Sequence, residues 1–156
     1  MKLLLVEDDD NKRQQVLELL RATFPKLEVK VASSLISALR KLKSEKPEIV
    51  LLDMTLPNYD LEEGATAGGL HAFGGEEFLR QTKRFGLSPA VVVITQFETF
   101  GDPPNDKGLV QLDEELRATF PTLYKGAVYY HASIYDWTSE LIEKLETSIP
   151  EVSGCR

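Results

Sequence analysis

Carboxylates follow two apolar runs of this chain at the point where each run ends. Residues 2–6 lead directly into Glu7 and Asp8, and residues 49–52 lead into Asp53. Like charges held close together cannot all stay ionised unless their pKa values rise or a cation binds among them. Carboxylate oxygens suit Mg²⁺, and a chain with one cysteine and two histidines offers no zinc cluster. A carboxylate beside such a cation can attack phosphorus as a nucleophile.

The elements expected to position these acids are strands of one parallel sheet. Four consecutive aliphatic residues, 49–52, are typical of a central strand covered by helices on both faces, and Pro57 ends that segment. The apolar run 90–94 ends in the same way on Thr95. Because ligands bind at the carboxyl ends of parallel strands, we expect Thr95 and the acids to share one edge of the sheet. A single Asp after a strand is more often a turn former, so the prediction depends on this convergence.

Strand-like and helix-like segments alternate along the whole chain. The expected strands are 2–6, 27–32, 49–52, 90–94 and 127–130. Helices are expected between them and after the last, with N-caps at Asp9 or Asp10 for the first and at Ser33 or Ser34 for the second. Five strands alternating with five helices predict an α/β fold, a flavodoxin-like three-layer sandwich whose parallel sheet has the order 2-1-3-4-5.

Composition limits the classes of protein. A chain of 156 residues, 42% of them hydrophobic, has the size of one domain, expected at 1–150 with a short tail at 151–156. The net charge of −7 without a Lys/Arg cluster argues against nucleic-acid binding. The apolar opening is too short for a signal peptide and no run reaches membrane-spanning length, so a cytoplasmic location is expected. Cys155, alone in the tail, is expected to be a surface thiol.

Two loops on the acid-bearing edge are expected to be long. Residues 58–75 hold five glycines and little apolar periodicity, and residues 96–107 are rich in glycine and proline. Loops of this length without secondary structure are usually functional or disordered. Two interpretations stay open: a lid or partner surface over the acids, or a flexible acidic excursion.

Three motifs together resemble a known family. Residues 6–9 (Val-Glu-Asp-Asp), 53–57 (Asp-Met-Thr-Leu-Pro) and 94–95 (Ile-Thr) are similar to the signature positions of response-regulator receiver domains, in the same order and on the same strands. The resemblance extends over nearly the whole chain, from residue 1 to about 149. The conjunction of the three motifs is far more specific than any one of them.

The resemblance implies a role for each matching residue. Asp53 would be the phosphoacceptor, Asp8 a direct Mg²⁺ ligand and Glu7 a nearby or water-mediated one. The backbone carbonyl of Thr55 would be a third protein ligand, and the Thr95 hydroxyl would follow the phosphoryl group. The donor would be a histidine kinase or phosphotransfer protein. No enzymatic activity beyond slow autodephosphorylation is expected.

One departure from the family concerns charge. Receiver domains normally carry a lysine at the end of the fifth strand, where its ammonium pairs with the phosphoryl group. Here Tyr130 takes that position, and Lys125 precedes the expected strand. A tyrosine hydroxyl can bind a phosphoryl oxygen but brings no positive charge, so we expect weaker phosphoryl stabilisation.

Three classes of function remain. The first is a single-domain response regulator of a two-component phosphorelay, a monomer or weak dimer that signals to a downstream protein and contacts neither membrane nor nucleic acid. The second is a degenerate receiver that serves as a phosphorylation-independent adaptor, which the missing lysine favours. The third, an aspartate-nucleophile phosphohydrolase, is disfavoured because Thr55 stands where those enzymes need a second acid.

Overall fold

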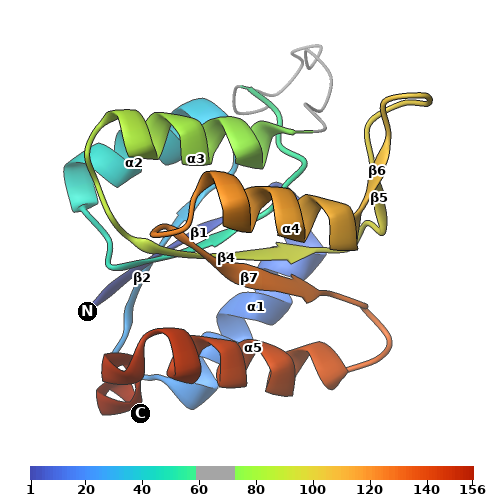
Figure 1. Cartoon of the computed structure of the whole chain (residues 1–156). Coiled ribbons are helices and arrows are strands. Elements are labelled where there is room, and N and C mark those ends of the chain that lie inside the picture. The colour runs from blue at the N-terminus through green and yellow to red at the C-terminus, as the bar shows by residue number, and fades with distance from the viewer. Residues whose placement is uncertain (59–72) are drawn as a thin grey trace, which may run out of the picture.

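The computed structural model describes residues 1–58 and 73–156, and its centre is a parallel sheet. Its strands lie in the order β2-β1-β3-β4-β7 (Figure 1), which confirms the predicted α/β sandwich and its strand order. The strands are β1 (Lys2–Val6), β2 (Glu28–Ala32), β3 (Ile49–Leu52), β4 (Ala90–Thr95) and β7 (Tyr124–Tyr129). β3 is buried along its whole length, as its unbroken aliphatic run predicts.

Helices cover both faces of the sheet (Figure 1). They are α1 (Asp10–Thr23), α2 (Leu35–Glu45), α3 (Gly74–Arg84), α4 (Leu109–Thr119) and α5 (Asp136–Ser148). Successive residues of β1 point to opposite faces, so Leu3 and Leu5 join the core under α1 and α5, whereas Leu4 and Val6 join the core under α2, α3 and α4. Within the described ranges, no helix combines the length and the apolarity needed to cross a membrane.

Side-chain caps fix where the first two helices begin. The Asp9 carboxylate accepts a hydrogen bond from Lys12 N at 2.8 Å, and Ser34 and Ser37 form a capping box. Each observed cap is one of the two residues predicted for it. The cap at Asp9 places Lys12 in the first turn of α1, next to the acids that follow β1.

The segment expected as the second long loop contains secondary structure. β5 (Thr99–Phe100) and β6 (Lys107–Gly108) pair antiparallel in a small hairpin that extends away from the sheet (Figure 1). The prediction of a structureless loop at 96–107 is therefore wrong. Phe100 anchors the hairpin in the core, where its side chain is only 2% exposed. Of the first predicted loop, residues 59–72 lie outside the described part of the chain, and Gly74 and Gly75 already belong to α3.

Two boundaries near the C-terminus also differ from the prediction. β7 begins at Tyr124 rather than Ala127, and a bulge leaves Lys125 opposite no residue of β4. The tail forms a 3₁₀ helix, η1 (Pro150–Cys155), whose Cys155 carbonyl accepts from Lys26 N at 3.0 Å. The Cys155 side chain packs in the core under α1 and α5, so the expectation of a surface thiol is wrong.

Candidate functional site

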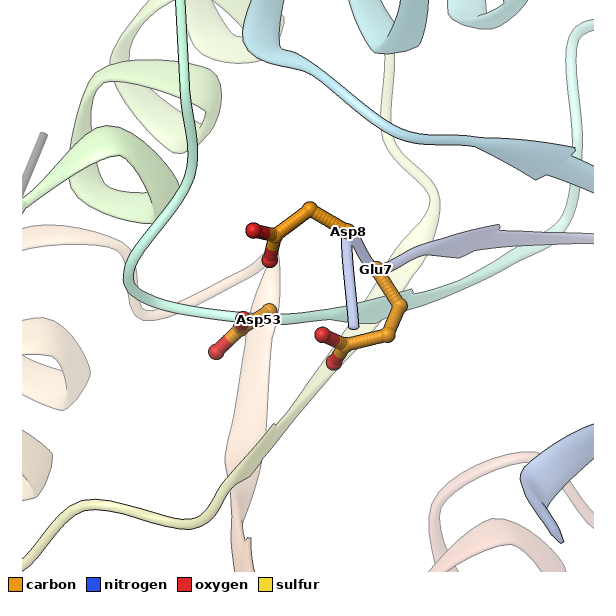
Figure 2. A group of neighbouring side chains, drawn as sticks. All are labelled: Glu7, Asp8 and Asp53. Atoms are coloured by element: carbon orange, nitrogen blue, oxygen red, sulfur yellow. The ribbon is translucent and has the colours of Figure 1, made fainter. Parts of the chain in front are cut away.

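Strand register brings the acids together. Val6 pairs with Leu52 in the parallel ladder, so Glu7 and Asp53 each stand one residue beyond the same pair. Asp53 N donates to Val6 O at 3.0 Å, which fixes the two strand ends against each other. One oxygen from each of Glu7, Asp8 and Asp53 lies within 4.8 Å of the other two (Figure 2). The predicted convergence of three carboxylates is confirmed.

The donor set fits a hard divalent cation. Two oxygens bound to one Mg²⁺ at about 2.1 Å can be no more than about 4.2 Å apart, so a small closing movement would bring the three acids into reach. Glu7 Oε1 is already held by Asp9 N at 3.0 Å, which leaves Asp8 and Asp53 as the better direct ligands. The backbone of the third predicted ligand also lies close, since Thr55 N is 3.4 Å from Asp53 Oδ1.

A buried lysine completes the cluster. The Lys12 side chain is 1% exposed, and its Nζ lies 2.6 Å from Glu7 Oε2 and 3.5 Å from Asp53 Oδ1. The same ammonium donates to the Ile94 carbonyl of β4 at 2.7 Å. The short separation from Glu7 Oε2 is that of a close, charge-assisted contact between the ammonium and the carboxyl group. A positive charge therefore stands among the acids, although β7 does not end on a lysine.

Burial and mutual repulsion disfavour the charged forms of two of the acids. Burial raises the pKa of Glu7 to about 8, with Lys12 opposing the shift and the charge of Asp53 adding to it. Burial also raises the pKa of Asp8, and the charge of Asp53 raises it further. Part of the site therefore holds protons near neutral pH, and a divalent cation that binds here would release them.

The two remaining predicted residues have defined partners. Thr95 is fully buried two residues beyond the Leu52–Val93 pair, at the same sheet edge as Asp53, and its Oγ1 accepts from Phe97 N at 3.1 Å. The Tyr130 hydroxyl donates to Gln15 Oε1 on α1 at 2.8 Å. The structure thus gives the Tyr130 hydroxyl a partner other than the acid cluster.

Sequence reasoning missed Lys12, although the chain carries a signal for it. Lys12 precedes Val16 by four residues and Leu20 by eight, so it lies on the apolar stripe that α1 turns toward the sheet. A lysine on that stripe must be buried, and the nearby strand end supplies the acids that can compensate its charge.

Comparisons with known proteins identify relatives by sequence and solved structures of the same fold. No family model matches the chain. An uncharacterised protein, y4jR of Sinorhizobium fredii, is 39% identical over 142 residues, which is 90% of this chain and 94% of that protein. The Detocs response regulatory protein DtcB of Enterobacter cloacae is 29% identical over 147 residues, covering 93% and 98% of the two chains. A CheY-like response regulator receiver domain from Methanospirillum hungatei superposes with a TM-score of 0.62 at 18% identity, covering 98% and 96%. The chain thus has the fold of CheY-like receiver domains and is similar over nearly its whole length to a response regulatory protein.

The cation beside the acids comes from a helix and not from the last strand of the sheet. The strand that ends at Tyr129 delivers no lysine to the acids, and Lys125 is only the second residue of that strand. Tyr129 pairs with Thr95 at the acid-bearing edge, so Lys125 lies toward the opposite end of β7. The ammonium near the acids belongs to Lys12 of α1.

We expect Asp8→Asn to stabilise the metal-free protein and to remove most of its stabilisation by Mg²⁺. Because the pKa of Asp8 is raised, the folded state binds more protons than the unfolded chain above about pH 4, and stability falls as pH rises. Asparagine removes that penalty together with a candidate metal ligand. In the parent protein, Mg²⁺ at about 100 times its dissociation constant should add about 2.7 kcal/mol. Thermal unfolding with and without Mg²⁺ measures both effects.

The matched control is Asp10→Asn, an acid two residues away whose side chain is 90% exposed. Its response to Mg²⁺ should equal that of the parent. If Asp8→Asn and Asp10→Asn respond alike to Mg²⁺, Asp8 is not a ligand.

Proposed function

We propose that this receiver is a single-domain response regulator that accepts a phosphoryl group on Asp53 and signals through protein–protein contacts. One observation carries the proposal: a buried carboxylate at a strand end, with two further carboxylates within 4.8 Å and a lysine ammonium at 3.5 Å. The acids would hold a divalent cation, and the ammonium would pair with the negative charge of a phosphoryl group. Phosphoryl transfer to a carboxylate requires that both the metal and a cationic side chain neutralise this charge.

The reaction follows from the chemistry of the residues. An Asp53 carboxylate oxygen forms a bond to the donor phosphorus while the bond from phosphorus to the donor nitrogen or oxygen breaks. The leaving atom keeps the electron pair, and the product is an acyl phosphate on Asp53. Asp8, Asp53, the Thr55 carbonyl and Glu7, directly or through water, would hold Mg²⁺. When bound, Mg²⁺ neutralises charge on the phosphoryl oxygens. The Thr95 hydroxyl would donate to one of those oxygens.

The proposed function also implies partner proteins and a cellular location. The phosphoryl donor would be a histidine kinase or phosphotransfer protein, and the recipient of the signal a downstream protein. The similarity to DtcB, a response regulatory protein of Detocs, supports a regulatory rather than an enzymatic role. We expect a cytoplasmic monomer or weak dimer that binds neither nucleic acid nor membrane. Its only catalysis would be slow loss of its own phosphoryl group.

A second candidate, a phosphorylation-independent adaptor, is favoured by one feature. Lys12 already compensates Glu7 without any phosphoryl group, so the metal-free site has a charge partner of its own. A chain with that arrangement could present a single surface to a partner in every condition. The two candidates differ in one measurable property, the ability of Asp53 to be phosphorylated.

Incubation with acetyl phosphate and Mg²⁺, followed by intact-mass measurement, tests the proposal. We expect one added phosphoryl group in the parent protein, none in Asp53→Asn and none when EDTA replaces Mg²⁺. Asp102→Asn, a change in the exposed β5–β6 hairpin, should be modified like the parent. A parent protein that gains no phosphoryl mass at high acetyl phosphate concentration would leave the adaptor as the better account.

A further inference from the structure

We propose that Lys12 is the cation that pairs with the phosphoryl group on Asp53, so that helix α1 supplies the charge that other receivers obtain from a strand-end lysine. This inference rests on the proposed function and assigns one more residue to it. The position of the ammonium, its remaining free donor and the absence of a competitor among the described residues all lead to Lys12.

Position is the first argument. Lys12 Nζ lies 3.5 Å from Asp53 Oδ1, the carboxylate that would carry the phosphoryl group. It is held in place from two sides, by Glu7 Oε2 at 2.6 Å and by the Ile94 carbonyl at 2.7 Å. A phosphoryl group on Asp53 adds about −2 of charge next to this ammonium, in surroundings where screening by water is weak.

Hydrogen-bonding capacity is the second argument. An ammonium group has three donors. Of those on Lys12, one is directed at the Ile94 carbonyl, and Glu7 Oε2, 2.6 Å from the ammonium, engages another. One donor therefore remains available to a phosphoryl oxygen without breaking either contact.

The third argument is that other cations are engaged elsewhere. Among the described residues, Lys12 is the one cation that forms an ion pair with Asp53, and residues 59–72 contain no lysine or arginine. Arg13 donates instead to the Glu7 carbonyl at 3.2 Å and pairs with Asp10. Lys125 lies in a groove with Glu140 and Glu143 of α5.

Lys12 also lies next to a pair of buried rings that can report its movement. Its Nζ is 5.9 Å from the centroid of the Tyr130 ring, and the Tyr130 and Trp137 rings are 5.0 Å apart. Trp137 is the only tryptophan in the chain. A shift of the ammonium toward a phosphoryl group changes the field at this ring pair, so tryptophan fluorescence should respond to an occupied Asp53.

Binding of beryllofluoride, a phosphoryl mimic, to the full chain in the presence of Mg²⁺ tests the inference, with bound fluoride observed by fluorine NMR. We expect Lys12→Met to weaken beryllofluoride binding roughly 10- to 100-fold, the factor that a hydrogen bond to a charged group provides. Mg²⁺ binding without beryllofluoride, measured by thermal unfolding, should be as tight as in the parent or tighter. The Trp137 fluorescence change should shrink with the lost occupancy.

The controls separate a direct contact from structural damage. Lys41→Met removes another helical lysine that donates to a strand carbonyl, that of Val31, and should bind the mimic like the parent. Should Lys12→Met fold poorly, Glu7→Gln/Lys12→Met removes both buried charges, and the loss of mimic binding should remain. Tyr130→Phe tests the competing assignment and should lose less than Lys12→Met does.

Each outcome has one meaning. Mimic binding in Lys12→Met within threefold of the parent would overturn the inference and leave the proposed function standing. An equal loss of Mg²⁺ and mimic binding would also overturn it, because Lys12 would then be a support for the acids only. Failure of the parent protein to bind beryllofluoride or accept a phosphoryl group would overturn the proposed function and this inference together.

Discussion

Lys12→Met is expected to lower the free energy of unfolding by about 3 kcal/mol at neutral pH, the cost of leaving a buried charge without its partner. Methionine has a similar length, so the change removes the ammonium while little apolar volume is lost. Asp53 then loses the ammonium 3.5 Å from its Oδ1, Glu7 loses the cation that opposes its protonation, and the Ile94 carbonyl loses its donor. Urea denaturation measures the effect.

The loss of stability caused by Lys12→Met should increase at high pH. Lys12 lowers the pKa of Glu7, so its removal raises that pKa further above the value of 4.5 in the unfolded chain. The folded variant then holds a proton that the unfolded chain releases, and its stability falls as pH rises. Parent and variant both hold the Glu7 proton below the parent pKa of about 8, so Lys12→Met should be about equally damaging at pH 5 and pH 7 and more damaging near pH 9. Adding Glu7→Gln should restore most of the extra loss at pH 9. A pH-independent loss, or no rescue by Glu7→Gln, would contradict the buried pair.

Gly75→Ala is expected to cost about 2 kcal/mol and to weaken Mg²⁺ binding at a distance from the ligands. A Cβ on Gly75 would lie 2.8 Å from the Asp53 carbonyl oxygen and 2.9 Å from Met54 Cα. Both contacts are with backbone, which cannot turn aside, so either α3 or the turn that carries Asp53 must move. Gly75 N also donates to the Met54 carbonyl at 2.9 Å, and that bond would lengthen.

Gly154→Ala is the matched control for Gly75→Ala. A Cβ at Gly154 meets nothing within 4 Å, so the same chemical change should alter the stability by less than about 0.5 kcal/mol. Calorimetric unfolding with and without Mg²⁺ compares the two variants. Equal stabilities, or an unchanged Mg²⁺ response in Gly75→Ala, would show that the close packing of α3 against the Asp53 turn does not position the site.

The residues of the site that could be predicted are those that directly follow a strand. Asp53 and Glu7 follow unbroken aliphatic runs, and such runs indicate both the burial of a strand and the residue at which it leaves the sheet. Parallel strands place their carboxyl ends at one edge, so convergence of the acids follows from topology without any knowledge of side-chain positions. The N-caps at Asp9 and Ser34 were predictable for a similar reason, since capping is local chemistry.

What could not be predicted depends on packing between distant segments. The apolar stripe of α1 indicates that Lys12 is buried, but it does not show that the ammonium reaches Asp53 and the Ile94 carbonyl. The β5–β6 hairpin depends on the burial of Phe100 against residues far away in sequence, which no local pattern shows. Cys155 was misjudged because the tail returns to the core under α1 and α5. In each case a tertiary contact outweighs the local signal.

The central claim is that Asp53 accepts a phosphoryl group whose charge is met by Lys12 rather than by a residue at the end of β7. A crystal structure of the protein with Mg²⁺ and beryllofluoride tests it most directly. The account predicts beryllofluoride on an Asp53 oxygen, the metal held by Asp8 and Asp53, and Lys12 Nζ within hydrogen-bonding distance of a fluoride. Beryllofluoride that is absent from Asp53, or that is bound there while Lys12 contacts Glu7 and no fluoride, would contradict it.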